Sequence, residues 1–360
     1  MKTDSSDQIF FLNPESYASH GVNFHIYKDE ILRFRDQWFM NDSPFLVQTS
    51  GSTGKPKTIE ISREQMEASA VMTAQALNLN SSDNALICLN TRYIAGKMML
   101  ARSFTLGMTA YILPPVANPL KAITSSLSIS FTAMAPYQIK MVLEESPDKI
   151  TLLDQMKAIL LGGAPVDPQL EEALQKTRGP VYSTYGMTET VSHIALRRLN
   201  GPDSSRAYTV LPGISVSVDA RSCLTIKGSV TQHKTLITND VVKLLSDNQF
   251  IWTGRIDNVI NSGGIKIQIE ELETSIGEIF IRLKYPHRFM ITGIPDDRFG
   301  TIVVLLIEGD FAEQKRKELA SALREKISKY ELPKKIISVA KFSETATGKI
   351  DRGATRSAIM

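Results

Sequence analysis

The segment Thr49-Ser50-Gly51-Ser52-Thr53-Gly54-Lys55-Pro56-Lys57 is the part of this chain from which its fold can be interpreted. It follows the apolar run of residues 45–47, which predicts a strand. Its glycines permit unusual backbone angles, its hydroxyls supply small hydrogen-bond donors, and its lysines supply positive charge. These properties predict a loop that holds phosphate oxygens, although a solvated serine- and glycine-rich surface loop has a similar composition.

The spacing of this loop excludes the phosphate loop of kinases and related NTPases. That motif separates its glycines by four residues and ends in Gly-Lys-Ser/Thr. Here Gly51 and Gly54 are separated by two residues, and Pro56 follows Lys55. The loop alone therefore does not distinguish a phosphate site from a surface loop, and the order of the remaining motifs is needed to distinguish them.

Composition indicates a globular protein with a large core. The 360 residues are enough for more than one domain, and the net charge of +3 is too small to argue for a nucleic-acid partner. Cys88 and Cys223 both lie in apolar segments, which favours buried thiols in a reducing compartment. Residues 1–8 are polar, and no run approaches about 18 apolar residues, so we expect a cytoplasmic protein without a transmembrane segment.

The chain after the loop alternates between strand-like and helix-like segments. Ser62 and Gln65 have the spacing of a capping box, and apolar residues then recur at helical spacing up to Leu77. Expected strands at 85–89, 110–113, 129–134, 158–161 and 181–184 alternate with expected helices at 97–106, 119–127, 137–144 and 168–174. This alternation predicts an α/β fold with parallel βαβ sheets, in which ligands bind beyond the carboxyl ends of the strands.

From about residue 191 the pattern changes to short strands, which predicts a β-rich subdomain. A turn-rich segment at 257–264 and a helix from 269 lead into a compact α+β pattern. We therefore expect a domain boundary near residue 255, with a large domain at 1–254 and a small C-terminal domain at 255–360.

Five further segments occur in a fixed order after the loop, at residues 161–165, 185–190, 238–240, 254–270 and 345–352. Together with the loop they resemble the adenylate-forming enzymes, the superfamily of acyl-CoA synthetases, luciferases and peptide-synthetase adenylation domains. The resemblance implies an AMP-forming acid–thiol ligase that uses ATP, Mg²⁺ and coenzyme A. It also implies that residues 1–254 are an adenylation domain that binds ATP and the acyl group, and that residues 255–360 are a mobile domain that carries the catalytic lysine. It assigns nucleotide contacts to Thr49, Ser50, Gly51, Ser52, Thr53, Gly54, Lys57, Gly162, Gly163, Ala164, Tyr185, Gly186, Asp240 and Arg255.

The same resemblance assigns the catalytic groups. Thr188 is expected at phosphate, Glu189 at Mg²⁺, and Lys349 at the acyl carboxylate and α-phosphate. A fixed cation is useful there, because two anions approach one another when a carboxylate attacks the α-phosphorus. Asp240 follows Asn239 where the family usually has glycine, and asparagine tolerates the left-handed backbone angles expected at that turn.

Two positions concern the second half-reaction, in which a thiol displaces AMP. Asp257 matches the family hinge, so rotation there would remove Lys349 and admit the thiol. Lys266 follows the hinge and is expected on the thiol side. A rigid linker between domains is the alternative interpretation of this segment.

Residues 185–196 most resemble the o-succinylbenzoate:CoA ligases of menaquinone biosynthesis. Their substrate is an aromatic keto dicarboxylate, so its second carboxylate needs a cationic or hydrogen-bonding pocket. We expect Arg102 to provide the cation, and Thr190, Ser192 and His193 to line the pocket. Arg102 as a surface residue and His193 as a structural histidine remain open alternatives.

Two features depart from the family. The phosphate loop begins early, which predicts an abbreviated N-terminal layer, and residues 90–96 lack the family's histidine. A shorter layer would expose apolar surface and favour a homo-oligomer, although the sequence does not determine an oligomeric state. Other aryl- or fatty-acyl-CoA or AMP ligases, and a non-catalytic nucleotide-binding relative, are the alternative functions.

Overall fold

The computed structural model describes residues 9–12, 24–40, 44–48, 58–121, 123–124, 126–344 and 350–359. The phosphate loop of residues 49–57 and the expected catalytic Lys349 lie outside the described residues. Their flanking strands and helices are described and define where these segments begin and end.

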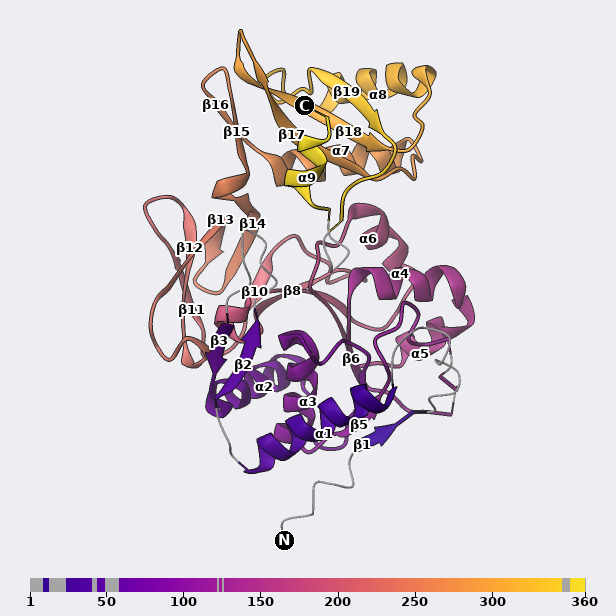
Figure 1. Ribbon diagram of the computed structural model, residues 1–360, viewed down its shortest axis with the longest axis vertical. Coiled ribbons are helices and arrows are strands. Elements are labelled where there is room, and N and C mark those ends of the chain that lie inside the picture. The colour runs from indigo at the N-terminus through magenta and orange to yellow at the C-terminus, as the bar shows by residue number, and fades with distance from the viewer. Residues whose placement is uncertain are drawn as a thin grey trace.

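A single twelve-stranded sheet forms the larger part of the protein (Figure 1). Its parallel half consists, in spatial order, of β1 (Ile9–Phe11), β5 (Thr109–Ile112), β4 (Asn84–Ile87), β6 (Phe131–Met134), β7 (Ala158–Leu161) and β8 (Val181–Gly186). The antiparallel half continues with β9 (His193–Arg198), β10 (Tyr208–Val210), β14 (Gln249–Arg255), β13 (Leu236–Ser246), β12 (Cys223–Lys227) and β11 (Ser215–Val218). The predicted α/β class is confirmed, and the β-rich region extends the same sheet.

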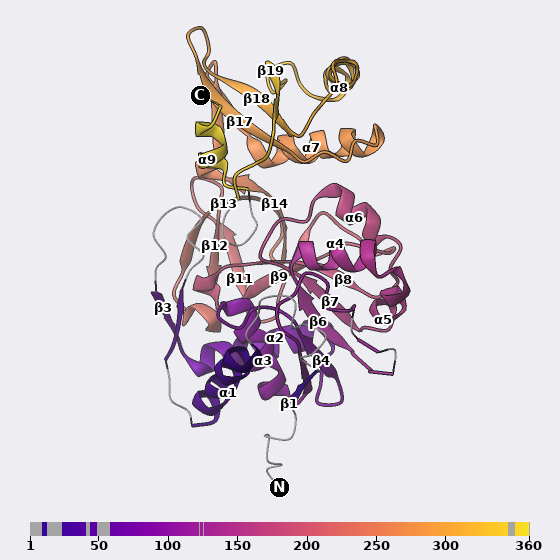
Figure 2. The same ribbon diagram turned by 45° about the vertical axis from the view of Figure 1, so that its right-hand side comes forward.

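Helices cover both faces of the parallel half (Figure 2). On one face lie α1 (Phe24–Met40), α2 (Arg63–Leu77) and α3 (Ile94–Leu106), and on the other lie α4 (Pro136–Glu145), α5 (Ile150–Asp154) and α6 (Pro168–Leu174). Strand β4 shows why both faces are buried: Ala85 and Ile87 belong to the first core, whereas Leu86 belongs to the second. Side chains alternate along a strand, so its continuous apolar run supplies both cores.

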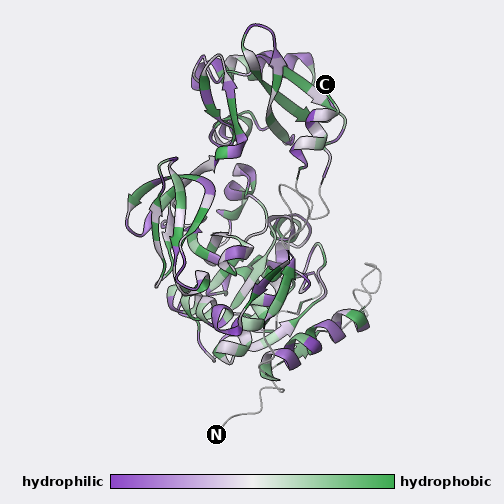
Figure 3. Cartoon of the chain, turned by 60° about the vertical axis from the view of Figure 1, so that its left-hand side comes forward, coloured by the Kyte–Doolittle hydropathy of each residue, from purple (hydrophilic) through white to green (hydrophobic). Residues whose placement is uncertain are grey.

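The C-terminal part has its own sheet and core. Its elements are β15 (Val259–Ser262), β16 (Ile265–Gln268), α7 (Ile269–Arg282), β17 (Phe289–Asp296), β18 (Gly300–Glu308), α8 (Glu313–Lys326), β19 (Lys335–Val339) and α9 (Arg352–Ser357). Strands β17, β18 and β19 form the sheet, and hydrophobic residues concentrate along the strands of both parts (Figure 3). No buried core cluster among the described residues contains members from both parts, and the domain boundary after residue 254 stays a prediction.

The two parts touch through α6 and α7. Gln169 Nε2 donates to the carbonyl oxygen of Tyr285 at 2.7 Å, and Arg206 forms an ion pair with Glu278. Gly277 faces Pro168 so closely that an added Cβ would lie 2.7 Å from the proline ring. Helix α7 also packs against β14 of the large sheet, but the buried core clusters of the two parts remain separate.

One local expectation is wrong. The described residues of the expected helix at 119–127 form isolated turns, because Leu120 and Ile123 are anchored in the core while serines and a proline surround them. In chain order the phosphate loop stands between β2 (Phe45–Gln48) and β3 (Thr58–Ile61), an antiparallel pair that precedes α2.

The predicted capping box is confirmed at the start of α2. Ser62 Oγ accepts from the Gln65 backbone at 3.3 Å, and the Gln65 side chain accepts from the Ser62 backbone at 3.0 Å. Gln65 Nε2 also donates to Val230 O at 2.7 Å, in the 3₁₀ helix η5 (Ser229–Thr231). The cap therefore joins the region behind the phosphate loop to the antiparallel half of the sheet.

No helix among the described residues is long and apolar enough to cross a membrane.

Asn200 is the polar residue on which the connection between α6 and β8 most depends. Its fully buried side chain donates to Thr177 O and Gly179 O and accepts from the Val181 backbone, all within 3.0 Å. We predict that Asn200→Ala lowers the free energy of unfolding by about 3 kcal/mol, since several buried backbone groups lose their partners. Urea titration would measure this.

The matched control for this prediction is Asn248→Ala, because Asn248 is exposed in the turn before β14. A loss in Asn200→Ala no larger than in Asn248→Ala would contradict the role given to Asn200.

Candidate functional site

Glycines at the carboxyl end of β7 bring backbone close to the neighbouring strand. Gly162 N–H donates to Met134 O at 3.2 Å, and an added Cβ at Gly162 would lie 2.5 Å from Thr184 Oγ1. Gly163 is exposed and has φ +82°, which side chains other than glycine rarely adopt. Together with the half-buried Ala164, they form a bare backbone surface at the sheet edge.

Tyr185, at the carboxyl end of β8, reaches across the sheet to Asp240. Its hydroxyl donates to Asp240 Oδ2 at 2.7 Å, and its ring packs edge-on against Phe250 and Tyr208. Burial and the nearby Asp240 raise the pKa of Tyr185, so the phenol stays a donor at neutral pH. This hydrogen bond joins two of the predicted nucleotide residues.

Asp240 lies at a bulge of β13, where residues 238–240 depart from regular pairing with β12. Its carboxylate accepts from Trp252 Nε1 at 3.3 Å and lies 3.7 Å from Arg255 Nη1. Asn239 is not among the described residues with positive φ, so the expected left-handed turn there is wrong. A bulge turns Asp240 without requiring glycine geometry.

Arg255 connects Asp240 to the expected hinge. Its guanidinium donates to both carboxylate oxygens of Asp257 at 2.8 and 2.7 Å. The Arg255 hydrogen bonds lower the pKa of Asp257, so this carboxylate is ionised at neutral pH. Asp257 lies in the 3₁₀ helix η6 (Ile256–Asn258), immediately after the last strand pairing of the large sheet.

Glu189 is an exposed carboxylate just beyond β8. It lies with Thr188 in the 3₁₀ helix η4 (Thr188–Thr190), and its carboxylate has no hydrogen-bond or ion-pair partner among the described residues. Within this part of the chain no group of three His, Cys, Asp or Glu could hold a metal ion. A single free carboxylate fits Mg²⁺, which is commonly held by one or two carboxylates together with substrate phosphates.

The chain reverses sharply between Glu189 and His193. Val191 has φ +66° and ψ −52°, and Ser192 N–H donates to Thr190 O at 2.7 Å, which defines a strained γ-turn. The Thr190 hydroxyl donates to Ser192 O at 2.8 Å, and an added Cβ at Gly186 would lie 2.3 Å from the same oxygen. The reversal therefore holds Ser192 and His193 directly behind the end of β8.

Arg102, on α3, points into this reversal and is almost fully buried. Its Nη2 donates to Ser192 Oγ at 2.8 Å and lies 3.4 Å from His193 Nδ1, while Nε donates to Thr73 Oγ1 at 3.3 Å. Burial lowers the pKa of Arg102 to about 9, so the side chain is a cation at neutral pH. No carboxylate of the described residues lies within 4.0 Å of it.

His193 is buried beside this cation. Its Nε2 lies 3.0 Å from Thr73 Oγ1, on α2. Burial, and then the charge of Arg102, lower the pKa of His193 well below its ordinary value, so the imidazole is neutral at neutral pH.

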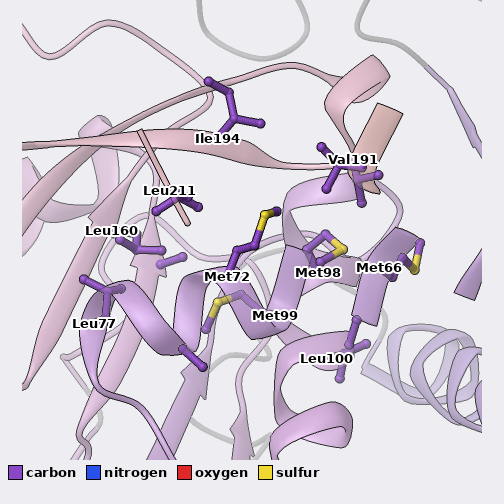
Figure 4. Packing of buried hydrophobic residues seen from close by; sticks show 14 of the residues in the cluster. Met66, Met72, Leu77, Met98, Met99, Leu100, Leu160, Val191, Ile194 and Leu211 are labelled. Atoms are coloured by element: carbon purple, nitrogen blue, oxygen red, sulfur yellow. The ribbon is translucent and has the colours of Figure 1, made fainter. Parts of the chain in front are cut away.

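Methionines of α2 and α3 form an apolar layer against the reversal. Figure 4 shows Met66, Met72, Met98 and Met99 on these helices, with Val191 and Ile194 above them, and all belong to one core cluster. Met99 Sδ lies 4.0 Å from Arg102 Nη1, so the layer continues to the guanidinium. Unbranched thioether side chains adapt to different apolar shapes.

These contacts bring most of the described candidates together, in two connected groups. One group links Tyr185, Asp240, Arg255 and Asp257, and the other links Gly186, Thr190, Ser192, His193 and Arg102. Lys266 stands apart as an exposed residue of β16. The roles assigned to all these residues, and to the loop residues and Lys349 outside the described ranges, stay predictions.

Sequence reasoning missed Thr73 and Trp252. Thr73 had a detectable signal, because it and Ser69 are polar residues on a helix whose other buried positions are apolar. Trp252 had none, since its hydrogen bond to Asp240 depends on how β13 pairs with β14.

A family model described as "AMP-binding enzyme" matches residues 18–222. A curated relative, 2-succinylbenzoate–CoA ligase from Bacillus cereus, is 24% identical over 351 residues, which cover 89% of this chain and 71% of the relative.

Solved structures are also similar to this chain, and two of them serve as examples. An acyl-CoA synthetase (AMP-forming)/AMP-acid ligase II-like protein from Dyadobacter fermentans is 42% identical, with a TM-score of 0.62 and coverage of 93% of this chain and 95% of that one. O-succinylbenzoate coenzyme A synthetase from Bacillus subtilis, in complex with ATP and magnesium ion, is 21% identical, with a TM-score of 0.71 and coverage of 86% and 69%. The second likeness shows a common fold.

The buried neutral imidazole predicts a pH dependence of stability. Below about pH 6.5 His193 binds a proton in the unfolded chain but stays neutral in the native protein. The free energy of unfolding therefore falls as the pH falls. The contribution of this one group has a slope of up to about 1.4 kcal/mol per pH unit. We predict that His193→Gln flattens the curve between pH 5 and 6.5, measured by urea unfolding against wild type. Parallel curves for the two proteins would contradict the assignment.

Proposed function

Because this chain belongs to the family of AMP-binding enzymes, we propose that it joins o-succinylbenzoate to coenzyme A at the expense of ATP, giving o-succinylbenzoyl-CoA, AMP and pyrophosphate. The family and its curated relatives make the chain an AMP-forming acid–thiol ligase. The acid, and with it a place in menaquinone biosynthesis, is the part we propose.

The observation that carries this choice of acid is the buried guanidinium of Arg102. Burying a cation that has no carboxylate partner costs free energy unless a bound anion pairs with it. A dicarboxylic substrate offers a second carboxylate that could do so, and the curated relatives are named for such an acid. Arginine also suits this role because its planar donors match a carboxylate.

The chain reversal after Gly186 connects the residues around Arg102 to Glu189. His193 lies so close to β8 that an added Cβ at Gly186 would be 2.5 Å from its Cα. Arg102 therefore lies on the buried side of the same chain reversal whose exposed side carries Glu189. We assign the aromatic middle of the acid to the side of the methionine layer, whose members belong to the hydrophobic core.

In the first half-reaction, a substrate carboxylate oxygen bonds to the α-phosphorus of ATP and the bond to pyrophosphate breaks. We assign the loop residues 49–54 and 57 to the departing phosphates, Thr188 to phosphate oxygens, and Asp240 with Arg255 to the ribose side. Magnesium, when bound, neutralises charge on the phosphate oxygens, and Glu189 would hold it. Lys349 would stabilise the oxygens where the two anions meet.

In the second half-reaction, the thiol sulfur of CoA bonds to the acyl carbon and the bond to AMP breaks. Lys349 has to leave the reacting carbonyl before the thiol arrives. Asp257 is a suitable pivot, because it follows the last pairing of the large sheet and precedes the C-terminal core. Lys266 would then contribute to the thiol side.

The acid can be tested by pyrophosphate release. We expect pyrophosphate release with o-succinylbenzoate and not with other aromatic or aliphatic acids. When CoA is added, the CoA thioester of o-succinylbenzoate should form. Arg102→Ala should raise the KM for o-succinylbenzoate about 10- to 100-fold, the value of one charged hydrogen-bonded pair, and leave the KM for ATP nearly unchanged. Arg178→Ala is the matched control, since Arg178 is exposed and distant in the chain.

Preferential release with long-chain acids would reject the proposed substrate and leave the enzyme class intact. An unchanged KM for o-succinylbenzoate in Arg102→Ala would remove Arg102 from the acid pocket. Adenylate formation without any thioester would favour an AMP ligase that uses another acceptor.

The hinge can be tested by separating the half-reactions. We predict that Asp257→Pro spares ATP–pyrophosphate exchange and slows thioester formation at least tenfold, because proline restricts the backbone at the pivot. Asp257→Ala is the control, since it removes the ion pair with Arg255 without stiffening the chain. Equal loss of both half-reactions in Asp257→Pro would refute the hinge.

A further inference from the structure

The surroundings of Arg102 are unusual because they consist of neutral acceptors. The guanidinium contacts Thr73 Oγ1, Ser192 Oγ, His193 Nδ1 and Met99 Sδ. Buried arginines are commonly paired with a carboxylate, which cancels their charge. Here the side chain is held in position, and no carboxylate from the described part of the chain lies close enough to compensate its charge.

The hydrogen bonds around Thr73 favour one tautomer of His193. The Thr73 hydroxyl has one proton, and Ser69 O, an acceptor only, lies 2.9 Å away. With that proton on Ser69 O, the hydroxyl accepts from its other neighbours, Arg102 Nε at 3.3 Å and His193 Nε2 at 3.0 Å. This arrangement fits a His193 that carries its proton on Nε2 and keeps a lone pair on Nδ1.

That lone pair faces the guanidinium. Arg102 Nη2 lies 3.4 Å from His193 Nδ1, so a proton on Nδ1 would confront an N–H group of the arginine. The Ser192 hydroxyl lies at the same distance from Nδ1 and can also donate to it. A neutral imidazole thus supplies an acceptor here without supplying a negative charge.

We propose that His193, held by Thr73 as the Nε2–H tautomer, is a positioning residue for Arg102. It orients the guanidinium without neutralising its charge, so the distal carboxylate of a dicarboxylic substrate is the group that pairs with Arg102. This inference rests on the proposed function and adds a specificity-determining role for His193. A carboxylate at position 193 would form an ion pair with the Arg102 guanidinium. The enzyme would then lose its preference for acids that carry a second carboxylate.

Two further observations identify hydrogen-bond donors near α2 and α3 that lack strong acceptors. Arg102 Nη1 has only the weak Met99 sulfur contact at 4.0 Å among the described residues, so its donors are available. The fully buried Ser69 hydroxyl has no partner in the same part of the chain, and Ser69 lies one helical turn from Thr73 on α2. Both groups are buried donors that a ligand oxygen could satisfy.

The first test changes the charge at position 193. His193→Glu should raise the KM for o-succinylbenzoate about 10- to 100-fold, as expected when one charged pair is lost. The KM for ATP, and that for 4-oxo-4-phenylbutyrate, which lacks the second carboxylate, should stay within about threefold. His193→Gln, whose amide can donate to Thr73 and accept from Arg102, should keep the KM for o-succinylbenzoate within about threefold.

Ser192→Asp provides a second route to the same result, should the glutamate variant fail to fold. The new carboxylate would lie beside Arg102 Nη2, which now donates to Ser192 Oγ at 2.8 Å. We expect the same selective loss for the dicarboxylic acid. An unchanged KM for o-succinylbenzoate in a folded His193→Glu or Ser192→Asp variant would overturn the proposal, as would an equal loss in His193→Gln.

The second test does not depend on the substrate. Ring ¹⁵N spectra of the wild-type protein should show His193 as a neutral imidazole protonated on Nε2, and Thr73→Val should disturb that signal. A proton on Nδ1, or an imidazolium at pH 7, would overturn the positioning role even if o-succinylbenzoate is the substrate. If the tautomer is confirmed and o-succinylbenzoate is not used, the failure belongs to the proposed function.

Discussion

The reversal of the chain between β8 and β9 is the constraint on which the rest of the site depends. The chain leaves β8 and, after six residues, pairs antiparallel with it as β9. The γ-turn at Val191 reverses the chain, and the absence of a side chain at Gly186 lets the returning backbone lie close to β8. The buried Thr190 hydroxyl closes it through backbone hydrogen bonds. Strain of this kind persists only where surrounding contacts over-determine the backbone, and here it occurs where the candidate residues meet.

This reversal separates two electrostatic environments by a few residues of chain. Glu189 is exposed on one side, where a carboxylate can share a hydrated cation with phosphates. Arg102 and His193 are buried on the other, where interactions between charges are stronger because water is excluded. The same turn can therefore serve an exposed nucleotide and a buried anionic end of an acid.

A second chain of contacts connects the large sheet to the C-terminal part. Tyr185 and Trp252 donate to Asp240, and Arg255 lies between the carboxylates of Asp240 and Asp257. The bidentate pair with Asp257 has the better geometry, since the Asp240 contact is 3.7 Å. An arginine shared by two carboxylates can move toward either without leaving an unpaired charge, which suits a junction between two parts with separate cores.

The sequence alone determined the class of fold, the order of the elements and the motifs at the strand ends, because periodicity, capping and glycine spacing act over a few residues. It failed for residues 119–127 and for the backbone at Asn239, where core anchoring and a bulge against β12 decide the conformation. It also suggested Arg102 and His193 without showing how they interact. Only the tertiary structure decided that Thr73, Arg102 and His193 form one network, because their partners lie up to 120 residues apart and burial, which sets their charges, depends on how α2 and α3 pack against β9.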